Sequence, residues 1–187
     1  GFDFMPAPML FDREEIPTTR FFELYDILRK KYDYIITDSS AEESSYYLSF
    51  AAACDDALIV SLHRSTAVRA AERTGIKLSE VGFKNLRLIV NGYDRVKSDS
   101  GELPTLFEII NRSAIKLLGA VPFSESLISD QENGVLALSS KERRLKTYEA
   151  AFLNTALRIT GENVPLLENV YFTAKRKNIY RKYGRIN

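Results

Sequence analysis

The residue with the clearest chemical potential is Asp38, an acid that closes the otherwise largely apolar segment Tyr32–Asp38. A carboxylate at the end of a buried strand can hold Mg²⁺, directly or through water, beside the phosphates of a nucleotide. It can equally cap the helix that follows, and the pattern alone leaves both interpretations open. A third hypothesis, an aspartate that accepts a phosphoryl group, is less favoured. That chemistry needs a lysine after a later strand, where this chain has Asn91 or Pro122.

Asn91 and Gly92 end another apolar segment, and the Asn91 side chain could contact a base. An amide both donates and accepts hydrogen bonds, as the edge of adenine requires. Asn-Gly is also an ordinary turn signal, so the second interpretation stays open. We expect His63 and Arg64 to project from a loop at the same edge, with His63 solvated rather than catalytic.

Cysteine and histidine are too few for several kinds of site. Cys54 is the only cysteine, which excludes an internal disulfide framework and a thiolate metal cluster. His63 is the only histidine, which leaves little for zinc chemistry or a histidine relay. We expect Cys54, in an alanine-rich segment, to be a small core residue.

The elements that would position these side chains alternate along the chain. Apolar runs predict strands buried on both faces, with a further candidate at Phe2–Met5: Tyr32–Asp38, Ala57–Leu62, Leu86–Asn91 and Lys116–Pro122. Apolar spacing and capping residues predict helices after Pro17, over Glu42–Ala53, from Ser65 as cap to about Ser79, over Leu103–Arg112, and from Ser139 through Ile159. The alternation predicts an α/β fold, a parallel sheet with helices on both faces. Ligands of such sheets bind beyond the carboxyl ends of the strands.

Composition places the chain among ordinary globular proteins. It has 187 residues, of which 45% are hydrophobic and 27% charged, which excludes disordered, collagen-like and low-complexity classes. The longest apolar run, near Leu48–Leu62, contains Asp55 and Asp56, so we expect no membrane span. No signal-peptide pattern opens the sequence, and we expect a soluble, cytoplasmic protein.

The charge is uneven. The formal net charge is +1, yet six of the 26 basic residues and none of the 25 acidic ones lie between Asn169 and Asn187. On a helical wheel this tail is basic and amphipathic, a pattern typical of contact with an anionic membrane surface. The residues that would make this contact are Phe172, Lys175, Lys177, Ile179, Arg181, Lys182 and Tyr183. A basic tail packed on the body or frayed in water remains the alternative. Nucleic acid is the less favoured partner, because charge alone gives only nonspecific affinity.

Several segments, taken in order, resemble the MinD/ParA-type family of deviant P-loop ATPases. Each piece is short, but their order and spacing carry the resemblance over nearly all of residues 1–165. The first segments are Phe2–Pro8, the helix from Pro17, and Tyr32–Ala41, which resembles a strand ending in the family's switch aspartate. The later ones are Val60–Arg69, which resembles the family's next strand and the start of the helix after it; Leu88–Tyr93, similar to a Val-Asn-Arg-Tyr segment; Leu118–Pro122, similar to Gly-x-Ile-Pro; and Gln131–Gly134, similar to Asn-x-Gly.

The resemblance implies roles for these residues. Asp38 would orient Mg²⁺ or water at the γ-phosphate of ATP, as the catalytic and metal-binding residue. Asn91 would contact adenine, with Gly92, Pro122 and Phe123 lining the base pocket. Members of the family usually work as nucleotide-sandwiched homodimers that position other protein machinery, often on membranes, so we expect protein partners and a peripheral place at the inner face of the membrane.

Departures from the family pattern are also informative. No Gly-Lys-Gly-Gly-like phosphate loop occurs in the sequence, and in the family that loop precedes the segments matched here. We therefore expect residues 1–165 to be the C-terminal part of such an ATPase domain, followed by a tail at 166–187, with ATP and Mg²⁺ bound only when the preceding segment is present. Ser40 and Glu42 replace the usual proline and glycine of the switch, and His63-Arg64 replaces Pro-Glu.

These changes predict weak or lost hydrolysis. They favour the CpaE/TadZ branch, which localises pilus-assembly machinery at cell poles, over division-site placement. The alternative hypothesis is a non-enzymatic scaffold or interaction module derived from the fold.

Overall fold

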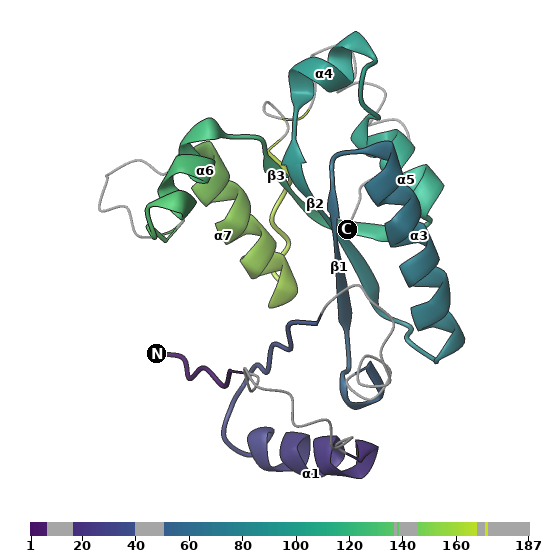
Figure 1. Ribbon diagram of the computed structural model, residues 1–187, viewed down its shortest axis with the longest axis vertical. Helices are drawn as coiled ribbons and strands as arrows, with labels where there is room; N and C mark the ends of the chain where they lie inside the picture. The colour runs from purple at the N-terminus through teal and green to yellow at the C-terminus, as the bar shows by residue number, and fades with distance from the viewer. Residues whose placement is uncertain (7–16, 40–50, 137, 139–145, 168–170, 172–187) are drawn as a thin grey trace. The chain divides into compact units, whose positions relative to one another are not determined.

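The computed structural model describes residues 1–6, 17–39, 51–136, 138, 146–167 and 171 (Figure 1). The chain forms two compact units, Gly1–Cys54 and Asp55–Asn187. The proposed cap at Ser139, most of the segment Glu42–Ala53 and the basic tail lie outside the described residues.

The second unit is built on a parallel three-stranded sheet with the order β1-β2-β3. The strands are β1 (Ala57–Leu62), β2 (Leu86–Tyr93) and β3 (Lys116–Pro122). The three strand predictions in this unit are confirmed, and β2 extends two residues beyond the expected end at Asn91. Leu88 and Val90 are fully buried, as the apolar pattern of a central parallel strand predicts.

Helices cover both faces of this sheet (Figure 1). The helices of this unit are α3 (Ser65–Glu80), α4 (Arg95–Ser100), α5 (Leu106–Ser113), α6 (Glu125–Glu132) and α7 (Thr147–Ile159). A methyl group built on Gly75 of α3 would lie 2.7 Å from the Ile115 side chain and 3.7 Å from that of Ile59, so α3 packs closely on that face. The α/β class with helices on both faces is confirmed.

On the other face, α7 lies directly against β3. A methyl group built on Gly119 of β3 would lie 2.3 Å from Thr155 Oγ1 of α7, closer than any real contact. The glycine therefore permits an approach that any side chain would prevent. Thr155 is buried there, whereas Ile159, at the end of the helix, is 44% exposed.

Two helix starts differ from the expectation. Ser65 was expected to cap α3, but Arg64 occupies that position and makes no side-chain cap. The helix expected from Leu103 begins at Leu106, because Thr105 and Glu108 form a reciprocal capping box. Since α4 and α6 are short and rich in polar residues, apolar spacing did not predict them.

The first unit contains α1 (Thr18–Leu28), whose N-cap is Pro17. Phe21 and Tyr25 are buried and form a small core with Ala53, against which Cys54 packs. The hydroxyl groups of Tyr25 and Thr37 are hydrogen-bonded. The apolar face predicted for this helix thus packs within its own unit.

The strand expected at Tyr32–Asp38 is not formed, and neither is the one at Phe2–Met5. Ile36 is 90% exposed in this extended segment. A strand requires a neighbour for its backbone N–H and C=O groups, and none of the described residues of this unit supplies one. Apolar composition alone was therefore insufficient.

Among the described residues, no helix has both the length and the apolar character needed to cross a membrane.

Candidate functional site

A pocket of about 340 Å³ opens at the carboxyl ends of the three strands. The sheet supplies Leu62, Asn91, Gly92 and Pro122, and the segments that follow the strands supply most of the rest. All four residues predicted to bind a base, Asn91, Gly92, Pro122 and Phe123, line it. The other lining residues are His63, Arg64, Asp94, Lys97, Leu103, Ser124, Leu127, Ile128, Gln131 and Phe152.

The local backbone presents Asn91 to this pocket. Asn91 pairs with Leu62 on one side and Val121 on the other, and its carbonyl accepts the His63 N–H at 3.2 Å. The ladder between β2 and β3 then shifts register at Gly92, whose φ of +70° favours glycine. The Asn91 side chain is half-buried and makes no hydrogen bond to any other described residue, so its donor and acceptor can serve a ligand.

His63 is not the solvated side chain that the sequence predicted, because it is only 3% exposed. Its Nε2–H donates to the Pro104 carbonyl at 2.7 Å, and its Nδ1 accepts the Asp94 N–H at 3.0 Å. The ring centroid lies 4.4 Å from that of Tyr93. Burial lowers the pKa of His63, against a smaller opposing effect of the hydrogen bond to Pro104. These partners hold a neutral imidazole in one tautomer beneath the pocket.

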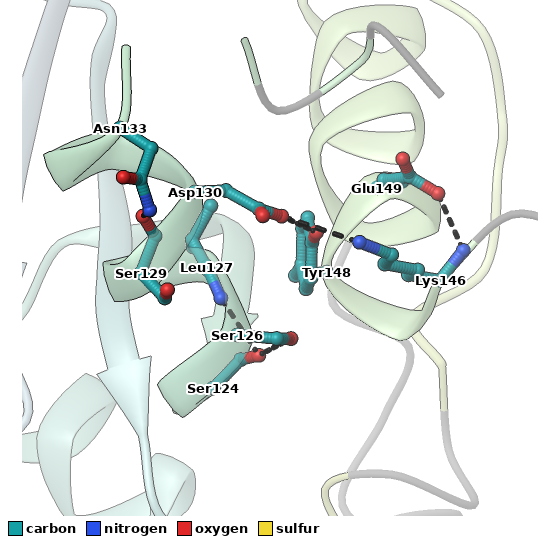
Figure 2. Close-up of polar contacts among 9 residues, drawn as sticks. All are labelled: Ser124, Ser126, Leu127, Ser129, Asp130, Asn133, Lys146, Tyr148 and Glu149. Carbon is teal, nitrogen blue, oxygen red and sulfur yellow. Dashed lines mark hydrogen bonds and ion pairs between the residues drawn. The ribbon is translucent and has the colours of Figure 1, made fainter. Parts of the chain in front are cut away.

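The opposite wall comes from α6 and α7, which supply Leu127, Ile128, Gln131 and Phe152. Figure 2 shows polar contacts within and between these helices. Leu127 of α6 packs with Val121 and Tyr148, and Phe152 of α7 joins this cluster. Asp130 Oδ2 accepts hydrogen bonds from Tyr148 Oη at 2.7 Å and from Lys146 Nζ at 3.2 Å. The Tyr148 hydroxyl, and next the Lys146 ammonium, lower the pKa of Asp130.

Sequence reasoning did not predict the residues of this wall. Ser124 caps α6 by accepting the Leu127 N–H at 3.3 Å, and the pair Ser124-Glu125 at the start of the helix was a usable signal. The approach of Phe152 to the pocket had no local signal, because it depends on how α7 packs on β3.

Asp38 belongs to the unit Gly1–Cys54, where it is exposed, and its catalytic and metal-binding role stays a prediction. Within the part of the chain that the structure describes, no three histidine, cysteine, aspartate or glutamate side chains gather as they would around a metal ion.

The membrane-contact residues predicted between Phe172 and Tyr183 lie outside the described residues. Tyr171, just before them, is 2% exposed, and its hydroxyl donates to the Ala120 carbonyl. Its ring meets that of Tyr93 edge-on at 5.7 Å. Arg158 Nε also donates to the Val164 carbonyl at 2.7 Å. Described residues that follow α7 therefore pack against the rest of the second unit. The boundary at 165/166 remains a prediction.

Comparison with known sequences finds MinD proteins among the relatives of this chain. No family model matches the chain. It is 29% identical over 164 residues to the septum site-determining protein MinD of Bacillus subtilis, covering 87% of this chain and 60% of that protein. It is 26% identical to MinD of Synechocystis, covering 88% of this chain and 61% of that protein. The chain thus spans about three fifths of the length of these relatives.

Comparison with solved structures agrees with this result. MinD of Aquifex aeolicus superposes with a TM-score of 0.72 at 25% identity, covering 81% of this chain and 64% of that one. The MinC:MinD complex of the same organism gives 0.71 at 24% identity, with 81% and 62% covered. MinD of Pyrococcus horikoshii, complexed with Mg-ADP, gives 0.64 at 20% identity, with 76% and 56% covered. In its sequence, its fold and the order of its segments, the chain is similar to MinD proteins, which supports the resemblance to the MinD/ParA-type family.

Proposed function

We propose that this chain is the base-binding part of a MinD/ParA-like positioning ATPase. The observation that carries the proposal is the pocket at the carboxyl ends of β1, β2 and β3, which collects Asn91, Gly92, Pro122 and Phe123. A volume of about 340 Å³ lies within the range of small-molecule sites, and such sites combine apolar walls with a few polar groups.

The pocket suits a flat purine base. Pro122, Phe123 and Phe152 supply apolar surface for the faces of the ring, and the half-buried Asn91 amide supplies one donor and one acceptor for its edge. A base whose edge does not offer a matching acceptor and donor could not form both hydrogen bonds with the Asn91 amide. Asn91 is therefore the residue proposed to select adenine.

Asp38 is the residue proposed to act at the phosphates. Mg²⁺ commonly uses only one or two carboxylates and keeps water and phosphate oxygens as its other ligands, so one aspartate is sufficient on the protein side. When ATP is bound, the ion supplies charge neutralisation at the γ-phosphate. Ser40 and Glu42, next to Asp38 in sequence, replace the small and rigid residues that the family resemblance leads us to expect, which supports weak or lost hydrolysis.

In the cell, this activity would serve the placement of other machinery. The related proteins are named for septum-site determination, and one neighbour is a complex of MinD with MinC. We propose a nucleotide-dependent homodimer that either localises pilus-assembly machinery, as in the CpaE/TadZ branch, or places the division site. The basic tail would provide contact with an anionic membrane.

A non-enzymatic scaffold derived from the fold is the second candidate, favoured by Ser40 and Glu42 in place of the usual proline and glycine of the switch. The two candidates differ in the behaviour of the dimer. An ATP-dependent increase in mass by light scattering supports the nucleotide switch, whereas equal dimerisation with and without ATP supports the scaffold.

Adenosine is the sharpest probe for the pocket, because it needs no phosphate loop. Titration followed by ¹H–¹⁵N NMR should move the resonances of Asn91 and Gly92, and guanosine should not. Asn91→Ala should weaken adenosine binding about tenfold, through loss of paired hydrogen bonds. Asn154→Ala, at a half-buried position of α7 that does not line the pocket, is the matched control. Equal affinity in Asn91→Ala and the parent chain would remove the adenine assignment.

A further inference from the structure

The wall that α6 contributes to the pocket is a helix with little attachment of its own. α6 has eight residues and only Leu127 is buried. Isolated helices of this length are unstable in water. The Ser124 hydroxyl caps its start, and Asn133 Nδ2 donates to the Ser129 carbonyl at 2.7 Å near its end. These bonds stabilise the helix internally but do not fix its position.

Two contacts with Tyr148 attach α6 to α7. Leu127 packs against Tyr148 and Val121. One turn later, Asp130 Oδ2 accepts the Tyr148 hydroxyl at 2.7 Å and the Lys146 ammonium at 3.2 Å (Figure 2). A single aromatic side chain thus receives both the apolar and the polar contact.

The partners of Asp130 are themselves held in place. Tyr148 is 3% exposed. The backbone N–H of Lys146 donates to the Glu149 carboxylate at 2.5 Å, and Glu149 is 1% exposed. Tyr148 and Lys146 therefore offer a preorganised pair of donors, and the low pKa of Asp130 means that the ionised acceptor is the form they hold.

The pocket-lining residues of α6 lie next to these contacts in sequence. Ile128 follows Leu127, Gln131 follows Asp130, and both line the pocket. Phe152, one turn after Tyr148 on α7, lines it as well. A displacement of α6 from α7 would therefore move Ile128 and Gln131 relative to Phe152 and change the width of the pocket.

We propose that Asp130 is a positioning residue, which holds the α6 wall of the pocket against the first turn of α7 although it does not line the pocket itself. The affinity of the pocket then depends on the hydrogen bonds that Asp130 accepts from Tyr148 and Lys146. The inference rests on the proposed function in one respect, since adenosine is taken as the ligand.

The first test measures adenosine affinity in variants that stay folded. Asp130→Ala and Tyr148→Phe should each raise the dissociation constant about fivefold, roughly the effect of one lost hydrogen bond. The double variant should be no weaker than the weaker single one, because both changes remove the same contact. Asp130→Asn keeps an acceptor for Tyr148 but loses the charge, so its affinity should be intermediate.

Arg158→Lys is the matched control. Arg158 lies at the other end of α7, where Nη1 donates to the Leu118 carbonyl at 2.5 Å and Nε to that of Val164. The Arg158→Lys variant loses hydrogen bonds of the same helix at a residue that does not line the pocket, so its affinity for adenosine should equal that of the parent chain. Variants at Asp130 and Tyr148 that are folded and bind adenosine as the parent does would overturn the proposal.

A second measurement separates this proposal from the proposed function. If the parent chain binds no adenosine, the base-pocket assignment fails, and amide hydrogen exchange of α6 then decides the role of Asp130. Faster exchange confined to Glu125–Glu132 in Asp130→Ala, with β3 unchanged, supports the positioning role. Unchanged exchange in α6 contradicts it.

Discussion

Two polar clusters flank the pocket, and they are built on opposite principles. The His63 cluster is buried and neutral, with two hydrogen bonds to backbone groups of Pro104 and Asp94. The Asp130 cluster is half-exposed and charged, with bonds from the Tyr148 hydroxyl and the Lys146 ammonium. A buried polar group is costly to unpair, whereas a partly solvated ion pair loses little because water replaces its partner. The His63 cluster should therefore contribute to the stability of the fold, and the Asp130 cluster should mainly fix the position of α6.

The largest difference is expected on removal of His63. His63→Leu leaves the buried Pro104 carbonyl and the part-buried Asp94 N–H without their partner, and should lower the free energy of unfolding by about 2–4 kcal/mol. Urea denaturation followed by far-UV circular dichroism measures this loss. His63→Gln, which can offer one donor and one acceptor, should recover part of it. Full stability in His63→Leu would show that the hydrogen bonds contribute nothing net.

Acidification should affect the clusters in different pH ranges. Burial lowers the pKa of His63 from its ordinary value of 6.5, so the unfolded chain takes up the proton first as the pH falls. The stability from His63 is complete above about pH 6.5 and is lost below it, with a slope of at most about 1.4 kcal/mol per pH unit. The pKa of Asp130 is lowered from 3.8, so its contribution is complete above that value and is lost only in stronger acid.

Thermal melts from pH 7.5 to 3 measure this dependence. The fall between pH 6.5 and 5 should be smaller in His63→Gln and unchanged in Asp130→Asn. The reverse result would exchange the roles assigned to the two clusters.

Tyr148→Phe should destabilise the protein less than His63→Leu. It removes the hydroxyl that donates to Asp130 but keeps the buried ring packed against Leu127 and Val121. The carboxylate can then bind water instead. Urea denaturation of this variant beside His63→Leu gives the ranking, and an equal loss in both would contradict the distinction between buried and half-exposed clusters.

The smallest effect should come from salt. Sodium chloride at about 0.5 M shortens the screening distance to a few ångströms and weakens the pair of Lys146 with Asp130. The imidazole of His63 is neutral and its two hydrogen-bond partners are backbone groups, so these bonds should respond much less to salt. The stability difference between the parent chain and Lys146→Met should therefore shrink with salt, whereas the difference between the parent and His63→Leu should stay constant.

These clusters also show where sequence reasoning succeeded. The strands β1, β2 and β3 could be predicted from their apolar runs. Asn91 and Pro122 could then be placed at the same edge of the sheet, because the carboxyl ends of parallel strands meet there. The burial of His63 could not be predicted, because its partner Pro104 lies 41 residues away in sequence. Asp130 and Tyr148 were not recognised, since their pairing depends on how α6 and α7 pack.

The segment Tyr32–Asp38 is a case in which a local sequence pattern predicted an element that the structure does not form. Its composition is that of a buried strand, yet Ile36 is exposed and the segment has no partner strand among the described residues. A strand forms only when a second strand pairs with it, so an apolar pattern in one segment is necessary for a buried strand but not sufficient.

The close contact of Gly119 with Thr155 has a consequence for variation among related sequences. Thr155 lies one turn after Phe152 on α7, so a larger residue at position 119 would act as a spacer that pushes the whole helix, and Phe152 with it, away from β3. The combined volume of residues 119 and 155 is thus constrained, whereas each volume alone is not. Substitutions at the two positions should be tolerated mainly as compensating pairs. Residues 119 and 155 thus set the width of the pocket although neither of them lines it.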